Sequence, residues 1–465
     1  MPAVRCSLHR LPRWLILAAW LTIAVEAVVA AGYLATVGRE TGAHRHAALE
    51  SSPPGDVKSL LDGSAPSGHH VNVRARTHAV RELLARRAQA LMSRDRAGFL
   101  ATVDPHAVAL RARQKAFFDN IASVPLSTWT YELNPNRQAM LPPAVVPVYG
   151  QSVWAPSVRL RYGLRDYDSR PTVQQRRYLF NRRGERWYLA DDGLSRRRLG
   201  QPGSGTVANL WDFGPVTAVA SQSVLVLGHP GAEDLMRSVL AVATEAVPRV
   251  AQVWPDWDRR AVVLTPEDAD ELGQLIEEPG DLSRMAAFTS VDVPHTGPAA
   301  GKRVLVNPDV LSKLSPYGRR IVLTHEITHV AARHVTTTAT PYWLAEGFAD
   351  YVAYRGAGVS VRVAARELAR EVREGKLPDE LPTAADFDPG NRRLSAAYQQ
   401  SWLACKLIAE RAGDAALVRL YRRLSAGEED PQRNLEVALR EELNLGAADF
   451  VALWRDYLEK HLKET

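Results

Sequence analysis

Cysteine is scarce in this chain, which narrows the chemistry it can perform. Only two cysteines, Cys6 and Cys405, occur in 465 residues. They lie on opposite sides of an apolar run that we expect to cross a membrane, so no internal disulfide is expected. Two cysteines this far apart also exclude a thiolate zinc cluster, and Cys405 is interpreted as a small core residue. The chemistry must therefore come from other side chains.

A strong charge imbalance is also missing. The formal net charge is +6, with 24% charged and 46% hydrophobic residues, which is ordinary for a globular protein of two domains. Arginines are dense between residues 159 and 198, where we interpret them as the solvated face of a sheet. We expect no nucleic acid as a partner on the far side of a membrane, and the sequence does not indicate an oligomeric state.

The N-terminus lacks acidic residues until Glu26, whereas three arginines precede an apolar run at 14–37. This run is long enough to span a hydrocarbon core of about 30 Å, so it predicts a transmembrane helix. The basic segment 1–13 then predicts a cytoplasmic N-terminus, with the rest of the chain outside the cell as a single-pass membrane protein. The alternative is a secreted protein, because small residues at 28–31 are typical of a signal-peptide cleavage site.

Two regions follow the apolar run. Residues 38–72 are rich in Gly, Ser and Pro with little apolar periodicity, which predicts a flexible linker. Residues 73–200 show apolar positions at helical spacing, followed by strand-like segments, which predicts a small α+β domain. This order of elements resembles the cone-shaped fold of the nuclear-transport-factor-like superfamily. No paired acid and base is evident there, so we expect a binding or spacer domain.

The last region, 206–465, changes character along its length. Its first half alternates short apolar strands with helices, and its second half shows amphipathic helical stripes. The strands are expected at 224–227, 261–265 and 303–308, and the last three helices at 413–425, 431–443 and 447–462. We therefore expect a mixed sheet followed by a mostly helical half, with a cleft between the two halves.

Residues 324–329 carry the pattern H-E-x-x-H on a predicted helix with Ser315 as its N-cap. His325 and His329 are four residues apart, so both imidazoles leave the same face and can bind one zinc ion. Glu326 lies about 100° round the helix from His325. From there its carboxylate can contact a metal-bound water without itself binding the metal.

The next predicted helix begins with Thr340 as N-cap and Pro341 as its first residue. On this helix Glu346 and Asp350 share one face, because they are also four residues apart. A third zinc ligand must come from outside the first helix, and Glu346 is in a position to supply it.

These two motifs, H-E-x-x-H and E-x-x-x-D, resemble the gluzincin group of zinc metallopeptidases, which includes thermolysin and aminopeptidase N. The resemblance covers roughly residues 220–460, and the motifs are its specific part. It implies Zn²⁺ as the cofactor, a thermolysin-like zincin fold and a peptide or protein substrate. The roles it implies are zinc ligand for His325, His329 and Glu346, general base for Glu326, and orientation of a ligand histidine for Asp350.

Two further features bear on the activity. Several gluzincins use a tyrosine on a later helix to stabilise the oxyanion of the tetrahedral intermediate, and Tyr398 is the candidate here, with a groove-lining tyrosine as the alternative. The G-x-M-E-N stretch by which aminopeptidase N relatives hold a free amine is absent, and residues 285–291 contain no glutamate. An endopeptidase is therefore expected rather than an aminopeptidase.

The sequence thus predicts an α+β protein: a transmembrane helix, a small cone-like domain and a zincin domain. Its expected function is that of a membrane-anchored, extracytoplasmic zinc endopeptidase. The alternative is a proteolytically inactive, zinc-binding relative that acts as a binding or scaffold module at the membrane surface. The presence of Glu326 favours the enzyme, because a structural zinc site does not need a base at that position.

Overall fold

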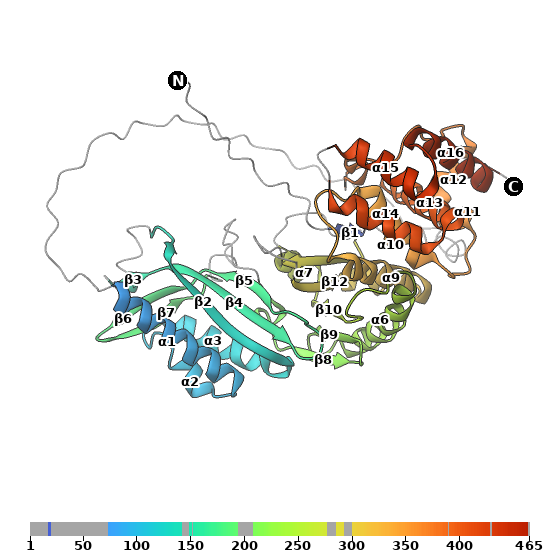
Figure 1. Cartoon of the computed structure of the whole chain (residues 1–465). Coiled ribbons are helices and arrows are strands. Elements are labelled where there is room, and N and C mark those ends of the chain that lie inside the picture. Colours follow the sequence, from blue (N-terminus) through green and yellow to red (C-terminus); the bar gives the residue numbers. More distant parts are fainter. Residues whose placement is uncertain are drawn as a thin grey trace, which may run out of the picture.

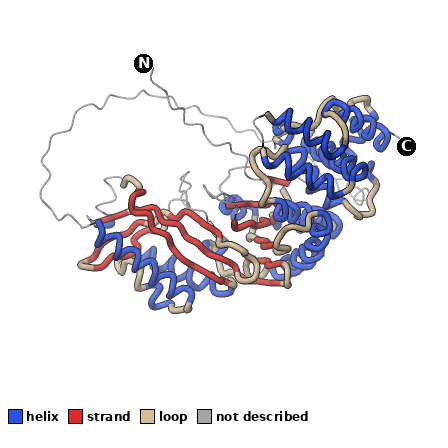
Figure 2. The backbone as a smooth tube through the Cα atoms, viewed as in Figure 1, coloured by secondary structure: helices blue, strands red, loops and turns tan. Residues whose placement is uncertain are grey.

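The computed structural model describes residues 17–19, 73–141, 148–150, 152–193, 208–276, 285–292, 300–388, 390–427 and 430–463. Figure 1 shows an N-terminal part of blue helices and long cyan-to-green strands beside a sheet, with the orange and red helices at the other end of the molecule. Helices and strands are both abundant in the described residues (Figure 2), so the fold is mixed α/β.

The N-terminal part begins with three helices, α1 (Val73–Met92), α2 (Arg96–Leu100) and α3 (Val108–Asn120), followed by a short 3₁₀ turn. Helix α1 is amphipathic, and it buries Val80, Leu83 and Leu84 against the strands that follow. Asp95 caps α2 by accepting a hydrogen bond from the backbone N–H of Gly98, which fixes the turn between the first two helices.

Six strands complete the N-terminal part and form two three-stranded antiparallel sheets. One sheet has the order β2-β4-β5 and the other the order β3-β6-β7. The strands are β2 (Leu126–Gln138), β3 (Val153–Trp154), β4 (Pro156–Leu164), β5 (Thr172–Arg176), β6 (Leu179–Arg183) and β7 (Arg186–Asp191). The resemblance to the nuclear-transport-factor-like superfamily stays a prediction.

A six-stranded sheet forms the centre of the second part, in the order β1-β11-β12-β10-β9-β8. The strands β9, β10 and β12 run parallel, and the others are antiparallel to their neighbours. Their bounds are β1 (Leu17–Ala19), β8 (Thr217–Ala220), β9 (Val224–Gly228), β10 (Ala261–Thr265), β11 (Ala287–Asp292) and β12 (Ala300–Val306). The parallel strands β9 and β10, and the end of β12 at 304–306, are apolar runs because both of their faces are covered.

The two faces of this sheet have different covers. Val226, Val263 and Val304 pack with the helices α6 (Glu233–Val253) and α9 (Pro316–Ala332). The alternate residues, such as Leu227, Val262 and Leu305, belong to a second cluster. That cluster also contains Trp129 and Trp211, together with residues of α7 (Ala269–Ile276). The N-terminal part therefore covers one face of the sheet and shares its core.

The C-terminal half is helical and packs on α9 and α6 (Figure 1). A close crossing of two of its helices depends on Gly347, where an added Cβ would clash with the backbone carbonyl of Ser401. The helices are α8 (Pro308–Leu311), α10 (Tyr342–Tyr354), α11 (Val361–Ala364), α12 (Arg366–Arg373), α13 (Leu394–Ala412), α14 (Asp414–Ala426), α15 (Pro431–Leu443) and α16 (Ala447–Lys463). This crossing of α10 and α13 brings three predicted site residues into one region.

The predicted transmembrane helix over residues 14–37 is wrong. Within that stretch Leu17–Ala19 forms β1, which pairs antiparallel with β11 so that Leu17 lies opposite Thr289. None of the helices in the described ranges is both long and apolar enough to cross a membrane. An apolar run without periodicity suits a strand as well as a helix, and here the outer edge of β11 supplies backbone partners. The rest of 14–37 lies outside the described residues, as do the predicted segments 1–13 and 38–72.

Candidate metal centre

Helix α9 carries the H-E-x-x-H motif into the interior of the molecule. Ser315 is its N-cap, as the sequence predicted, and accepts a 3.1 Å hydrogen bond from the backbone N–H of Gly318. From Ile321 onward every residue of the helix is buried, because β11, β12, α6 and α10 surround it. The motif therefore lies on a rigid, desolvated element. This is the kind of support that holds a catalytic group in place.

Three side chains from two helices meet at this centre. His325 and His329 project from successive turns of α9, and their Nε2 atoms lie 3.0 Å apart. Glu346 reaches them from α10, with its Oε2 at 3.3 Å from Nε2 of His325 and 3.6 Å from Nε2 of His329. In the described part of the chain these three residues form the only such cluster of potential metal ligands.

The geometry of this cluster suits a zinc ion. Tetrahedral coordination with bonds of about 2.0–2.2 Å separates neighbouring ligand atoms by roughly 3.3–3.6 Å, which is close to the spacing observed here. Oε2 of Glu346 is buried and has no hydrogen-bond partner, so it is left to bind a cation. The neighbouring histidines outweigh burial and lower the pKa of Glu346 to about 2, which keeps the carboxylate ionised. Two histidines and one glutamate form the donor set of a catalytic zinc site with an open position.

Asp350 lies one turn beyond Glu346 and orients the first histidine. Its Oδ1 accepts a 2.7 Å hydrogen bond from Nδ1 of His325, and both side chains are buried. This bond places the proton on Nδ1 and leaves Nε2 with its lone pair directed at the cluster. Helix α10 begins one residue later than predicted, with Pro341 rather than Thr340 as N-cap.

Glu326 lies beside the cluster on α9 and contacts the sheet. Its Oε2 accepts a 2.7 Å hydrogen bond from the hydroxyl of Thr289 on β11. Its Oε1 is buried and has no hydrogen-bond partner. Burial raises the pKa of Glu326, against the opposing effect of the two histidines and Thr289. A carboxylate with one oxygen fixed, the other free and a raised pKa has the properties of a general base.

Thr289 is a residue that sequence reasoning missed. The segment 285–291 was predicted only as a strand near the site, and no motif identifies the threonine. Its contact with Glu326 depends on the antiparallel pairing of β11 with β12, which sets Thr289 opposite Val304. The available signal was a polar residue within a buried apolar strand, since such a side chain requires a partner.

Tyr398 also lies at the centre, near the N-terminal end of α13. It is buried, and its ring centroid is 6.4 Å from that of His325. Phe387 packs against its other side at 5.2 Å. His334, by contrast, lies beyond the end of α9 with its ring against Trp254, away from the cluster. The structure thus brings together all six predicted site residues, and their chemical roles stay predictions.

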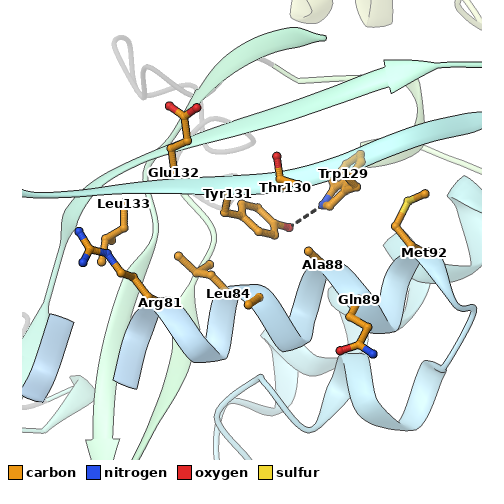
Figure 3. A pocket seen from close by; sticks show the side chains of 11 residues that line it. Arg81, Leu84, Ala88, Gln89, Met92, Trp129, Thr130, Tyr131, Glu132 and Leu133 are labelled. Carbon is orange, nitrogen blue, oxygen red and sulfur yellow. Dashed lines mark hydrogen bonds between the residues drawn. The ribbon is translucent and has the colours of Figure 1, made fainter. Parts of the chain in front are cut away.

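A second feature of the chain is a groove of about 690 Å³ in the N-terminal part. Figure 3 shows Leu84, Ala88 and Met92 of α1 on one side, and Trp129 and Tyr131 of β2 on the other. Nε1 of Trp129 donates a 2.9 Å hydrogen bond to the hydroxyl of Tyr131. The lining also includes the polar side chains of Arg81, Gln89, Thr130 and Glu132, and the role of the N-terminal part stays a prediction.

The comparison with known families agrees with the geometry of the buried centre. Residues 285–368 match Peptidase family M48, a family of zinc metallopeptidases. The match spans less than a fifth of the chain, yet it contains Thr289, all of α9 and Glu346 with Asp350. No curated protein matches the chain. The cluster and the match together identify this region as a zincin-type metallopeptidase domain, as the motifs predicted.

Proposed function

We propose that this protein is a zinc-dependent endopeptidase whose ligands are His325, His329 and Glu346 and whose general base is Glu326. One observation carries the proposal. Three potential ligand atoms converge within 3.0–3.6 Å in a buried site, while the adjacent Oε1 of Glu326 has no partner. A structural site does not need such a base beside it.

In the proposed reaction the zinc ion and the side chains have separate roles. A zinc ion bound at this donor set lowers the pKa of water to about 7 and polarises a carbonyl oxygen. Glu326 accepts the proton of the attacking water at Oε1 and delivers it to the leaving nitrogen as the C–N bond breaks. Tyr398 donates from its hydroxyl to the oxyanion of the tetrahedral intermediate. The products are a new carboxyl group and a new amine.

The edge of β11 supports an extended peptide as the substrate. In the structure this edge already pairs with an extended backbone, Leu17–Ala19, in an antiparallel register. A substrate strand that replaced β1 at this position would run past Thr289 and lie beside Glu326. No carboxylate lies in 285–289 to hold a free amino terminus, so cleavage of internal peptide bonds is favoured over removal of terminal residues.

We also propose that the protein acts outside the cytoplasm. The basic segment 1–13 and the apolar run that follows it have the composition of an export signal, and small residues at 28–31 provide a cleavage site. N-terminal sequencing of the mature protein after cell fractionation tests this proposal. A start shortly after residue 31 in the exported fraction supports it, and a cytoplasmic protein that begins at Met1 contradicts it.

The peptidase proposal is tested with zinc-loaded full-length chain and a library of internally quenched peptides. We expect one zinc per chain in the wild type and in Glu326→Gln, and cleavage by the wild type alone. Mass spectrometry of the products should place the cleaved bonds inside the peptides. Loss of single terminal residues would contradict the endopeptidase assignment, and equal cleavage by Glu326→Gln would contradict the role of the base.

A further inference from the structure

A cleft of about 480 Å³ lies between the N-terminal part and the peptidase part. It shares no residue with the His325 cluster, although Val330 and His334 at the end of α9 line it. The N-terminal part contributes the turn between β4 and β5, and the peptidase part contributes the loop before β10 and the start of β12. The remaining lining residues are Tyr167, Asp168, Ser169, Arg170, Asp256, Trp257, Asp258, Arg260, Val262, Gly301 and Lys302.

The hydrogen-bond acceptors of this lining are already engaged. Two of its three carboxylates, those of Asp168 and Asp256, are paired with arginines, whereas Asp258 accepts a hydrogen bond only from the neutral hydroxyl of Ser169 and keeps its charge. The pairs are Asp168 with Arg303 at 2.8 Å, Asp256 with Arg422 at 2.8 Å, and Asp258 with Ser169 at 2.7 Å.

Several hydrogen-bond donors of the lining side chains, in contrast, have no partner. The side chains of Arg170, Arg260 and Lys302 form no hydrogen bond or direct ion pair with any residue of the described ranges, although the charge of Asp258 acts on Lys302. Nε1 of Trp257 is buried and also lacks a partner. Three cationic side chains therefore line the same cleft, against one carboxylate, that of Asp258, which is not paired with an arginine. A ligand that supplies acceptor oxygens would complete this arrangement.

Burial of these unpaired cations destabilises the folded state. Lys302 is partly buried, and desolvation lowers its pKa despite the opposing charge of Asp258. Arg333, behind it at the end of α9, is buried with Nε unpartnered, and desolvation lowers its pKa as well. Removing a cation from water without pairing it destabilises the folded state, and an anion bound beside it reverses that cost.

We infer that this cleft binds a small organic anion, with its phosphate or carboxylate group held by Lys302 and Arg260 and its body against Trp257. The volume lies within the usual range of about 300–1,000 Å³ for small-molecule sites and far exceeds that of a free phosphate. Because both parts of the chain line the cleft, the bound anion bridges them. Because it binds the folded state, it stabilises the fold by an amount that grows with the logarithm of its concentration above the dissociation constant.

Calorimetric titration of the full chain tests the inference with inorganic phosphate, phenyl phosphate and benzoate. Titrations of zinc-loaded and of chelator-treated protein separate this cleft from the metal centre, which attracts anions only when zinc is bound. We expect saturable binding in both forms and a raised melting temperature. Phenyl phosphate or benzoate should bind more tightly than inorganic phosphate. The tighter of the two organic anions shows whether the natural ligand carries a phosphate or a carboxylate group.

Two variants localise the binding. Lys302→Met and Arg260→Gln should each weaken it by about tenfold or more, the loss expected when one charge-assisted hydrogen bond is removed. Lys302→Met should also keep or raise the melting temperature of the ligand-free chain, because it removes an unpaired cation. The control is Arg237→Gln, which removes an exposed arginine paired with Asp234 on α6 and should leave binding unchanged.

Three results would overturn the inference. The first is the absence of saturable binding for all three probes. The second is unchanged affinity in both cleft variants, which would assign the binding to another surface. The third is equal affinity for inorganic phosphate and both organic anions, which would contradict contact with Trp257. None of these outcomes depends on peptidase activity.

Discussion

The hydroxyl of Thr289 donates a 2.7 Å hydrogen bond to Oε2 of Glu326, and this contact links the edge of the sheet to the proposed general base. It fixes one carboxylate oxygen and leaves Oε1 for the attacking water. Because Thr289 lies on β11, the strand that positions the substrate backbone in our proposal would also position the base.

Replacing Thr289 tests whether its hydroxyl positions Glu326 without a part in binding the substrate backbone. Thr289→Val keeps the shape but loses the hydroxyl, so we expect kcat to fall by about tenfold while KM stays nearly unchanged. Thr289→Ser restores a hydroxyl at the same position and should recover most of the activity. Steady-state kinetics on one cleaved peptide measure both variants at equal zinc content. A valine variant with wild-type kcat would show that Thr289 does not position Glu326.

Asp350→Asn tests the orientation of His325. Asparagine still offers an oxygen to Nδ1, but it removes the negative charge that increases the basicity of the histidine. We expect the dissociation constant for zinc to rise by about 10- to 100-fold. Competition with a chromophoric chelator measures this change, and the exposed carboxylate variant Asp234→Asn is the control. Unchanged zinc affinity in Asp350→Asn would contradict the role of this carboxylate.

Gly347→Ala tests the close crossing of α10 and α13. The added Cβ would clash with the backbone of Ser401, so we expect a loss of about 1–3 kcal/mol in the free energy of unfolding, although alanine favours a helix. Gly318→Ala in α9 is the matched control, because its nearest new contact is the Cβ of Leu314 at 3.3 Å. Urea denaturation measures both. Equal stability of the two variants would show that the crossing tolerates a side chain.

The contact between His229 and Glu271 predicts that the free energy of unfolding depends on pH. Its Nε2 lies 2.8 Å from Oε1 of Glu271, and its Nδ1 lies 2.8 Å from the carbonyl oxygen of Pro215. The hydrogen bond to Glu271 raises the pKa of His229 above its usual value, against the effect of partial burial. The stabilisation is therefore complete below the unfolded-state pKa of about 6.5 and is lost as the pH rises through the higher folded-state value.

The variant His229→Gln measures this contribution. At about pH 5.5 it should lower the free energy of unfolding by about 1 kcal/mol, after allowance for solvent screening of the pair. At about pH 9 the loss should be smaller, because the wild-type histidine is then neutral. Urea denaturation at both pH values gives the comparison. A loss that grows with pH would contradict the raised pKa.

The sequence predicted the parts of the molecule that depend on local periodicity. The four-residue spacing of His325 and His329, and of Glu346 and Asp350, is enough to place each pair on one helix face. The predicted N-cap Ser315 is confirmed. The last three helices are confirmed to within one residue, as Asp414–Ala426, Pro431–Leu443 and Ala447–Lys463.

What the sequence could not predict depends on long-range pairing. Thr289 contacts Glu326 only because β11 lies beside α9 in the folded sheet. The transmembrane prediction failed for a related reason, because an apolar run does not reveal whether a strand edge elsewhere will accept it. The packing of Trp129 and Trp211 against the peptidase sheet likewise has no signature in sequence spacing.

The most direct test of the account is the restoration of cleavage by zinc. The full-length wild type and Glu326→Gln are stripped with a chelator, and cleavage of one quenched peptide is followed as zinc is added back. The account predicts that activity returns in the wild type in proportion to bound zinc, up to one ion per chain, whereas Glu326→Gln binds zinc equally and stays inactive. Activity in the stripped wild type, or restored activity in Glu326→Gln, would contradict it.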